Sequence, residues 1–229
     1  MLLKKILDDI ISLLDESWET MISVQAILAI VLIVSFITYM YIYFKEDLKR
    51  MPVLLFGYVF LAIGIMLTKR SKLGMAPWGV FHQGLMVQTG LSFGVITQLV
   101  GLVILILSVV LLKTKIGIGT IFNVLIVGFL IDAFDEIYQY QPQLLISKSI
   151  VLVMGIIIMT FGRSLYISAK LGSGPRDGVF VGLSRITNFD VKYVKPAIEF
   201  TVLLVGFFMG GTFGAGTVIT VIVSGYLVK

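Results

Sequence analysis

The stretch Leu171–Leu183, LGSGPRDGVFVGL, decides how this chain folds, because LGMAPWGVFHQGL at Leu73–Leu85 repeats its pattern 98 positions earlier. Each copy places Gly-x-x-Pro between a long apolar segment and a shorter one. Glycine and proline interrupt helices, and proline is favoured in the first turn of a new helix. Each copy is therefore predicted to break an apolar span and to begin a short helix.

The repeat extends well beyond these two stretches. Identical residues recur 98 positions apart on both sides of Gly-x-x-Pro, including the pairs Gly57 and Gly155, Gly64 and Gly162, Gly74 and Gly172, Pro77 and Pro175, and Gly84 and Gly182. A second motif, Gly-x-Gly-Thr, occurs at Gly117, Gly119 and Thr120 and again at Gly214, Gly216 and Thr217. Matches at one fixed spacing indicate an internal duplication.

The composition is that of an integral membrane protein. Of 229 residues, 58% are hydrophobic and 14% are charged, and the mean hydropathy is +1.05. The chain has no cysteine, which excludes disulfides, thiolate metal sites and cysteine nucleophiles. Its formal charge of +5 is attributed to loops at the cytoplasmic face and not to nucleic acid binding.

Charges divide the chain into apolar spans. Residues 1–50 are predicted to hold an amphipathic helix in the membrane interface and an additional transmembrane helix, Val24–Phe44. Residues 51–138 form the first repeat and residues 139–229 the second. The predicted spans within the repeats are Val53–Thr68, Phe93–Leu112, the segment that opens at Gly117, Ser149–Ser168, the segment around Pro196–Gly210 and the segment that opens at Gly214.

The short segments 76–89 and 175–186 determine the topology. Each is shorter than the roughly 20 residues that a membrane crossing needs. If neither crosses, most lysines and arginines fall on one side, as the positive-inside rule requires. The predicted fold is an all-α helical bundle of two inverted repeats, each with about three spans and one short re-entrant helix.

Broken helices within a membrane are typical of binding sites. Interruptions before Trp78, Ile121, Arg176 and Val218 each precede a helix N-terminus, which favours an anion or carboxylate. Transporters with inverted repeats use broken helices in this way. The alternative is that the glycines only allow close helix packing, and for the Gly-x-Gly-Thr loops the two interpretations stay open.

Arg176 is the strongest candidate for a functional residue. A cation in the first turn of a helix opposes the helix dipole, so helix stability does not explain it. Asp177 beside it suits the dipole and is a candidate ion-pair partner. Arg176 is predicted to contact substrate or the other repeat, the alternative being an interfacial arginine that reaches lipid headgroups. The matching positions of the first repeat are Trp78 and Gly79.

Other polar residues complete the candidate site. Glu199 lies in an apolar span and is either a coupling-ion site or the ion-pair partner of Lys195, one turn away. His82, the only histidine, is expected to make a polar contact beside Gln83 and not to bind a metal. At the end of a predicted span, Asp135 and Glu136 are expected in a solvated loop, and Asp132 is a candidate partner of Lys229.

The chain resembles the YczE-like bacterial membrane proteins, the YczE/YyaS/YitT group. The resemblance rests on Gly74-x-x-Pro77-Trp78 and the residues that follow, on Gly-x-Gly-Thr with Asn123 and Gly128 to Asp132, and on Gly172-x-Gly174-Pro175-Arg176-Asp177-Gly178. It covers about residues 52–229 and implies a multi-spanning plasma-membrane protein. This chain departs from the family at Gly79, where aspartate is frequent, and in residues 1–50, which resemble an addition.

These observations predict a bacterial plasma-membrane protein without an enzymatic role or a cofactor. The first hypothesis is a small transporter or permease-like protein with a site between the repeats. The predicted ligand-binding residues are Trp78, His82, Gln83, Asn123, Arg176, Asp177 and Glu199. The alternatives are an accessory or regulatory membrane subunit, with a protein partner held through the N-terminal helix, and the substrate-binding component of an energy-coupled importer.

Overall fold

The computed structural model describes residue 45 and residues 47–114 and 116–226. The chain divides into two units, residues 1–49 and 50–229. Within the described residues all regular structure is helical, with no strand. The predicted interfacial helix and the predicted span Val24–Phe44 lie outside the described residues.

The helix boundaries follow the breaks in the sequence pattern. Proline begins both short helices, and Ser92 and Asp190 cap the N-termini of the helices that follow them. The helices are Asp47–Ser71, α2 (Pro77–Thr89), α3 (Phe93–Val110), α4 (Ile118–Ile137), α5 (Leu145–Ser168), α6 (Pro175–Thr187), α7 (Val191–Phe208) and α8 (Ala215–Tyr226).

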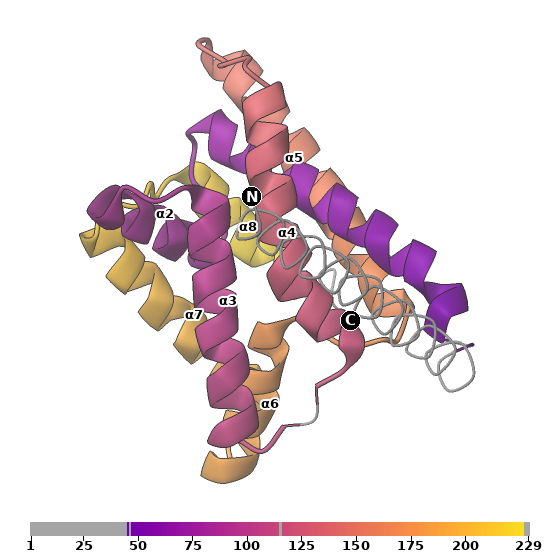
Figure 1. Cartoon of the computed structure of the whole chain (residues 1–229). Coiled ribbons are helices and arrows are strands. Elements are labelled where there is room, and N and C mark those ends of the chain that lie inside the picture. The colour runs from indigo at the N-terminus through magenta and orange to yellow at the C-terminus, as the bar shows by residue number, and fades with distance from the viewer. Residues whose placement is uncertain (1–44, 46, 115, 227–229) are drawn as a thin grey trace, which may run out of the picture. The chain divides into compact units, whose positions relative to one another are not determined.

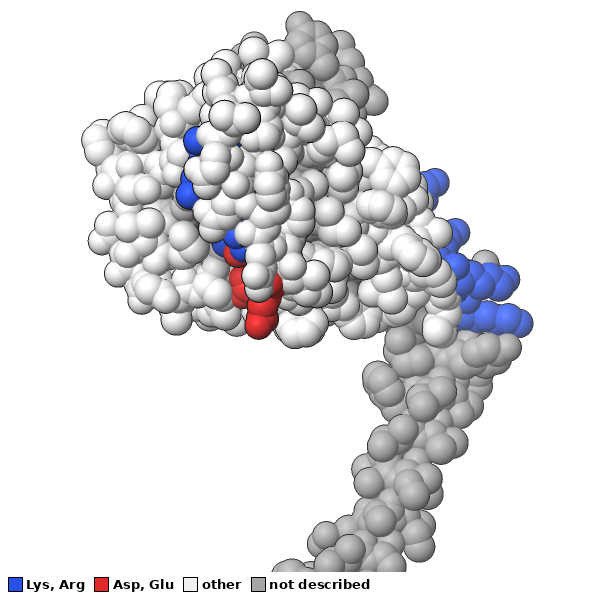
Figure 2. Space-filling model, turned by 90° about the horizontal axis from the view of Figure 1, so that it is seen from above, with Lys and Arg blue, Asp and Glu red and all other residues white. Residues whose placement is uncertain are grey.

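Four helices, Asp47–Ser71, α3, α4 and α5, are long and apolar enough to cross a membrane. Their exposed side chains are largely apolar, as Leu99, Val103 and Ile106 on α3 illustrate. On the face drawn in Figure 2, charged side chains gather in a few small areas, and the rest of the described surface is uncharged. Helix α7 is not among the four, because Lys192, Lys195 and Glu199 lie within its 18 residues.

The two Gly-x-x-Pro loops are held by the two Gly-x-Gly-Thr loops. Gly74 and Gly172 have φ of 105° and 138°, a conformation that residues with a side chain rarely adopt. The amide of Gly119 donates a hydrogen bond to the Leu171 carbonyl over 2.9 Å, and the amide of Gly216 donates to the Leu73 carbonyl over 2.8 Å. Each Gly-x-x-Pro loop thus bonds to the Gly-x-Gly-Thr loop of the other half of the sequence.

Helix packing crosses between the halves in the same way. Helix α2 packs against α7, and α3 packs against α6 (Figure 1). Between Asp47–Ser71 and α5, Gly57 packs against the backbone of Tyr166, and Gly155 packs against Thr68. Along Asp47–Ser71, the contact on α5 moves from Tyr166 at Gly57 back to Gly155 at Thr68, so the two helices are antiparallel.

The prediction that Asp135 lies in a solvated loop is wrong, because Asp135 lies in the last turns of α4 and forms ion pairs. Its carboxylate lies 2.7 Å from Lys69 Nζ and 2.5 Å from Arg70 Nε, and Arg70 also donates to the Asp135 carbonyl. Asp132 accepts a hydrogen bond from the Gly94 amide at 2.8 Å and another from the Ser92 hydroxyl, at the N-terminus of α3. These contacts hold together the ends of Asp47–Ser71, α3 and α4. Lys229, the candidate partner of Asp132, lies outside the described residues.

We expect Gly162→Ala to destabilise the protein. An added Cβ would lie 2.7 Å from the Gly57 carbonyl oxygen and 2.8 Å from a Phe60 backbone atom, and backbone atoms cannot yield as side chains do. Overpacking of this kind costs about 1–3 kcal/mol. Thermal unfolding in mild detergent measures the loss. The control is Gly174→Ala, whose Cβ has 3.4 Å of clearance to the Tyr166 hydroxyl; equal melting temperatures for the two variants would contradict the close packing.

Candidate functional site

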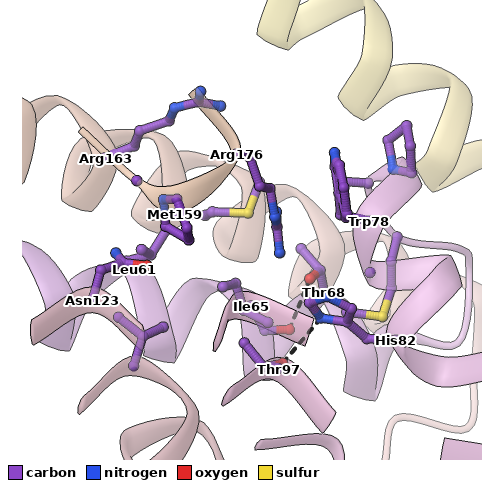
Figure 3. Close-up of a pocket in the computed structure, with 18 of the residues that line it drawn as sticks. Leu61, Ile65, Thr68, Trp78, His82, Thr97, Asn123, Met159, Arg163 and Arg176 are labelled. Carbon is purple, nitrogen blue, oxygen red and sulfur yellow. Dashed lines mark hydrogen bonds between the residues drawn. The ribbon is translucent and has the colours of Figure 1, made fainter. Parts of the chain in front are cut away.

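A cavity of about 170 Å³ lies among the helices (Figure 3). All eight helices given above contribute to its wall. Most of the lining is apolar, including Leu61, Ile65, Val127, Met159 and Phe180. A cavity of this size, with a few polar groups on an apolar wall, suits a small organic ligand.

Among the described residues, the charged side chains that line the cavity all come from the second half of the chain. Arg163 lies on α5, Arg176 and Asp177 on α6, and Glu199 on α7. Arg163 Nη2 lies 3.6 Å from a carboxylate oxygen of Asp177. Asp177 therefore pairs with Arg163 and not with its neighbour Arg176, which was the candidate partner.

Arg176 lies over the ring of Trp78, with its guanidinium carbon 4.8 Å from the ring centroid (Figure 3). This cation–π contact joins α6 to α2, at the two positions that match in the sequence repeat. Within the described part of the chain, Arg176 makes no hydrogen bond and no ion pair. Trp78 is 7% exposed, and its buried Nε1 also has no hydrogen-bond acceptor.

His82 lies one helical turn after Trp78 and is 2% exposed. Its Nδ1 lies 3.0 Å from the Thr97 hydroxyl oxygen, and that hydroxyl is 2.8 Å from the Phe93 carbonyl oxygen. Because the hydroxyl has one hydrogen, which it donates to Phe93, it accepts from Nδ1–H of His82. In the neutral ring Nε2 is then an acceptor, and it has no partner.

The remaining predicted site residues divide into three groups. Asn123 and Glu199 line the cavity, and no ion pair within 4.0 Å joins Glu199 to Lys195. Gln83 is not part of the cavity wall, because its side-chain oxygen accepts a hydrogen bond from the Thr212 amide at 3.0 Å. The glycines and threonines of the Gly-x-Gly-Thr loops hold the Gly-x-x-Pro loops in place, as Thr120 does through the Ser173 carbonyl at 2.5 Å.

Sequence reasoning missed Arg163 and Thr97. Arg163 interrupts a run of otherwise uncharged residues in α5, and an ionisable residue within a transmembrane helix is by default a functional candidate. That signal was present in the sequence. Thr97 gave none, because a threonine in an apolar helix usually bonds to its own backbone.

The N-termini of α2 and α6 both face the cavity. Ala76, Pro77 and Trp78 line it on one side, and Gly174, Pro175 and Arg176 on the other. Neither terminus has a side-chain capping hydrogen bond. Uncapped helix N-termini present backbone amides and a positive dipole end, which favour an anion.

We expect Thr97→Val to lower the stability of the protein by about 1–3 kcal/mol, because it leaves the buried Nδ1–H of His82 without an acceptor. Thr97→Ser, which keeps the hydroxyl, serves as the control. Unfolding in detergent, followed by tryptophan fluorescence, measures both variants. A valine variant as stable as the serine variant would contradict the assigned tautomer.

Comparison with known proteins assigns the chain to a family. Residues 48–229 match the model of a family of unknown function, DUF6198. An uncharacterized protein of Haemophilus influenzae is 34% identical over 75% of this chain and 78% of its own length. The membrane protein YczE of Bacillus subtilis is 32% identical over 76% of this chain and 80% of its own length.

The protein YyaS of Bacillus subtilis is 26% identical over 75% of this chain and 86% of its own length. No solved structure matches the chain. The resemblance to YczE-like proteins is confirmed by these relatives. The chain is a membrane protein that belongs to the DUF6198 family.

Proposed function

We propose that the protein is a small transporter or permease-like protein of the bacterial plasma membrane, which binds a small organic carboxylate in the cavity between two inverted repeats. No catalytic activity is proposed for the protein. Its partners are the lipid bilayer and the small-molecule ligand.

The observation that carries the proposal is the unpaired guanidinium of Arg176. It lines a cavity among eight helices, four of which are long and apolar enough to cross a membrane, and it lies on Trp78 without a hydrogen bond or ion pair within the described residues. A charge at membrane depth without a partner is costly and marks a functional site. Arginine also matches a carboxylate with two parallel hydrogen bonds.

The uncapped N-termini of α2 and α6 support an anionic ligand independently of Arg176. Both lie in the cavity wall and present positive dipole ends to the same space. Broken helices whose N-termini point at an anionic substrate group occur at the midplane of inverted-repeat transporters. The position of the cavity between the halves fits that arrangement.

Reciprocal contacts support the inverted repeats. Gly57 meets Tyr166 and Gly155 meets Thr68, which are the same contact with the two halves exchanged. A two-fold axis generates such pairs. The equivalent helices Asp47–Ser71 and α5 are antiparallel, so the axis runs across them and, where they span the membrane, lies in its plane.

An accessory subunit remains the alternative, but it depends on the N-terminal helix, which lies outside the described residues. The cavity favours a ligand-binding role over a purely structural one. An interface with a protein partner does not require an unpaired arginine inside the bundle.

We expect small carboxylates to raise the melting temperature of the purified protein in mild detergent, and Arg176→Gln to abolish this effect while the protein stays folded. The probes are sodium acetate, propanoate, lactate and succinate, with phosphate for comparison. The control, Lys192→Gln, removes the same charge from an exposed side chain on α7 and leaves the effect unchanged.

Two results would overturn the proposal: no compound that carries a carboxylate group, amino acids included, stabilises the protein, or Arg176→Gln retains the full stabilisation. Flux of a stabilising carboxylate into proteoliposomes then tests transport separately from binding. Binding without flux in wild-type vesicles would retain the site and reject the transporter.

A further inference from the structure

We infer that the ligand is a zwitterion of the amino acid class, with its carboxylate bound by Arg176 and its ammonium group bound by Glu199. The inference rests on the proposed carboxylate site and adds the second half of the ligand. It follows from the charges that face the cavity and from which of them are already paired.

Of the residues that the structure describes, equal numbers of basic and acidic side chains line the cavity. Two are basic, Arg163 and Arg176, and two are acidic, Asp177 and Glu199. Arg163 and Asp177 form an ion pair of 3.6 Å. One cation and one anion, Arg176 and Glu199, are left without an ion-pair partner among the described residues, and no ion pair within 4.0 Å joins them to each other.

Lys195 is the basic residue that competes for Glu199. It lies one turn earlier on α7 and forms no ion pair with Glu199 within 4.0 Å. It is also not part of the cavity wall, whereas Glu199 is. Glu199 is therefore in the cavity wall without an ion pair to Lys195, and its carboxylate is the group that a ligand cation would meet.

Electrostatics then selects among ligand classes. A simple carboxylate would satisfy Arg176 and leave Glu199 beside a like charge, which costs binding energy in a poorly solvated cavity. A simple amine would satisfy Glu199 and leave Arg176 without a partner. A zwitterion pairs with both, so Arg176 and Glu199, which have no ion-pair partner among the described residues, each acquire a counter-charge from the ligand.

The rest of the wall suits the other parts of such a ligand. The described first half supplies no charged side chain to the cavity. It supplies Trp78, whose Nε1–H has no acceptor, and His82, whose Nε2 has no donor. Apolar residues such as Ile65 and Val127 complete that side and suit an uncharged amino acid side chain.

Matched sets of probes test the inference by isothermal titration calorimetry on the full chain in detergent. Each set contains an amino acid, its counterpart without the ammonium group and its counterpart without the carboxylate. The sets are L-alanine, propanoate and ethylamine; L-leucine, 4-methylpentanoate and 3-methylbutylamine; and L-phenylalanine, 3-phenylpropanoate and 2-phenylethylamine. We expect at least one amino acid to bind tenfold or more tightly than both of its counterparts.

Variants assign the two ends of the ligand. Glu199→Gln is expected to weaken amino acid binding at least tenfold and to leave binding of the matched carboxylate unchanged or stronger. Arg176→Gln is expected to weaken both. Lys195→Gln, the control on the same helix, leaves the preference for the amino acid intact, and the melting temperature without ligand checks that each variant folds.

The outcomes separate this inference from the proposed function. If carboxylates bind as tightly as amino acids in every set, or if Glu199→Gln weakens both equally, the zwitterion is rejected while the carboxylate site stands. If neither class binds, or if Arg176→Gln changes nothing, both proposals are rejected.

Discussion

The structure depends on two backbone hydrogen bonds that cross between its halves, from Gly119 to Leu171 and from Gly216 to Leu73. A break in a helix exposes amides and carbonyls, which is tolerated at membrane depth only where protein or a wet cavity satisfies them. Here each Gly-x-x-Pro loop accepts a backbone hydrogen bond from the Gly-x-Gly-Thr loop of the other half. The glycines allow this because a side chain at Gly172 or Gly74 would meet the opposing threonine.

This mutual support allows the two halves to share a backbone pattern while residues of the cavity wall differ between them. The shared residues, glycines and prolines, set the backbone in both halves. Several positions in the cavity wall differ between the halves: Arg176 matches Trp78, and Glu199 matches Gly101. Arg176 and Trp78 stack on each other, so this contact in the cavity wall depends on the two matched residues being different.

Much of this could be predicted from the sequence, because breaks in apolar spans are local signals. The starts of α2 and α6 were predicted from Pro77 and Pro175, and the structure brings Arg176 and Trp78 into the same wall. The choice of ion-pair partner could not be predicted. Asp177 is adjacent to Arg176 in sequence but pairs with Arg163, because neighbouring helical side chains point away from each other.

With both short helices re-entrant, as the sequence predicts, Lys69 and Arg70 fall on the side of the membrane with fewer lysines and arginines, which the positive-inside rule disfavours. Both are held by Asp135 at the end of α4, so neither is a free loop charge. The rule concerns charges in short loops, and an ion pair that joins two helices gives a structural reason for basic residues at that end. Such a contact between segments distant in sequence leaves no local pattern.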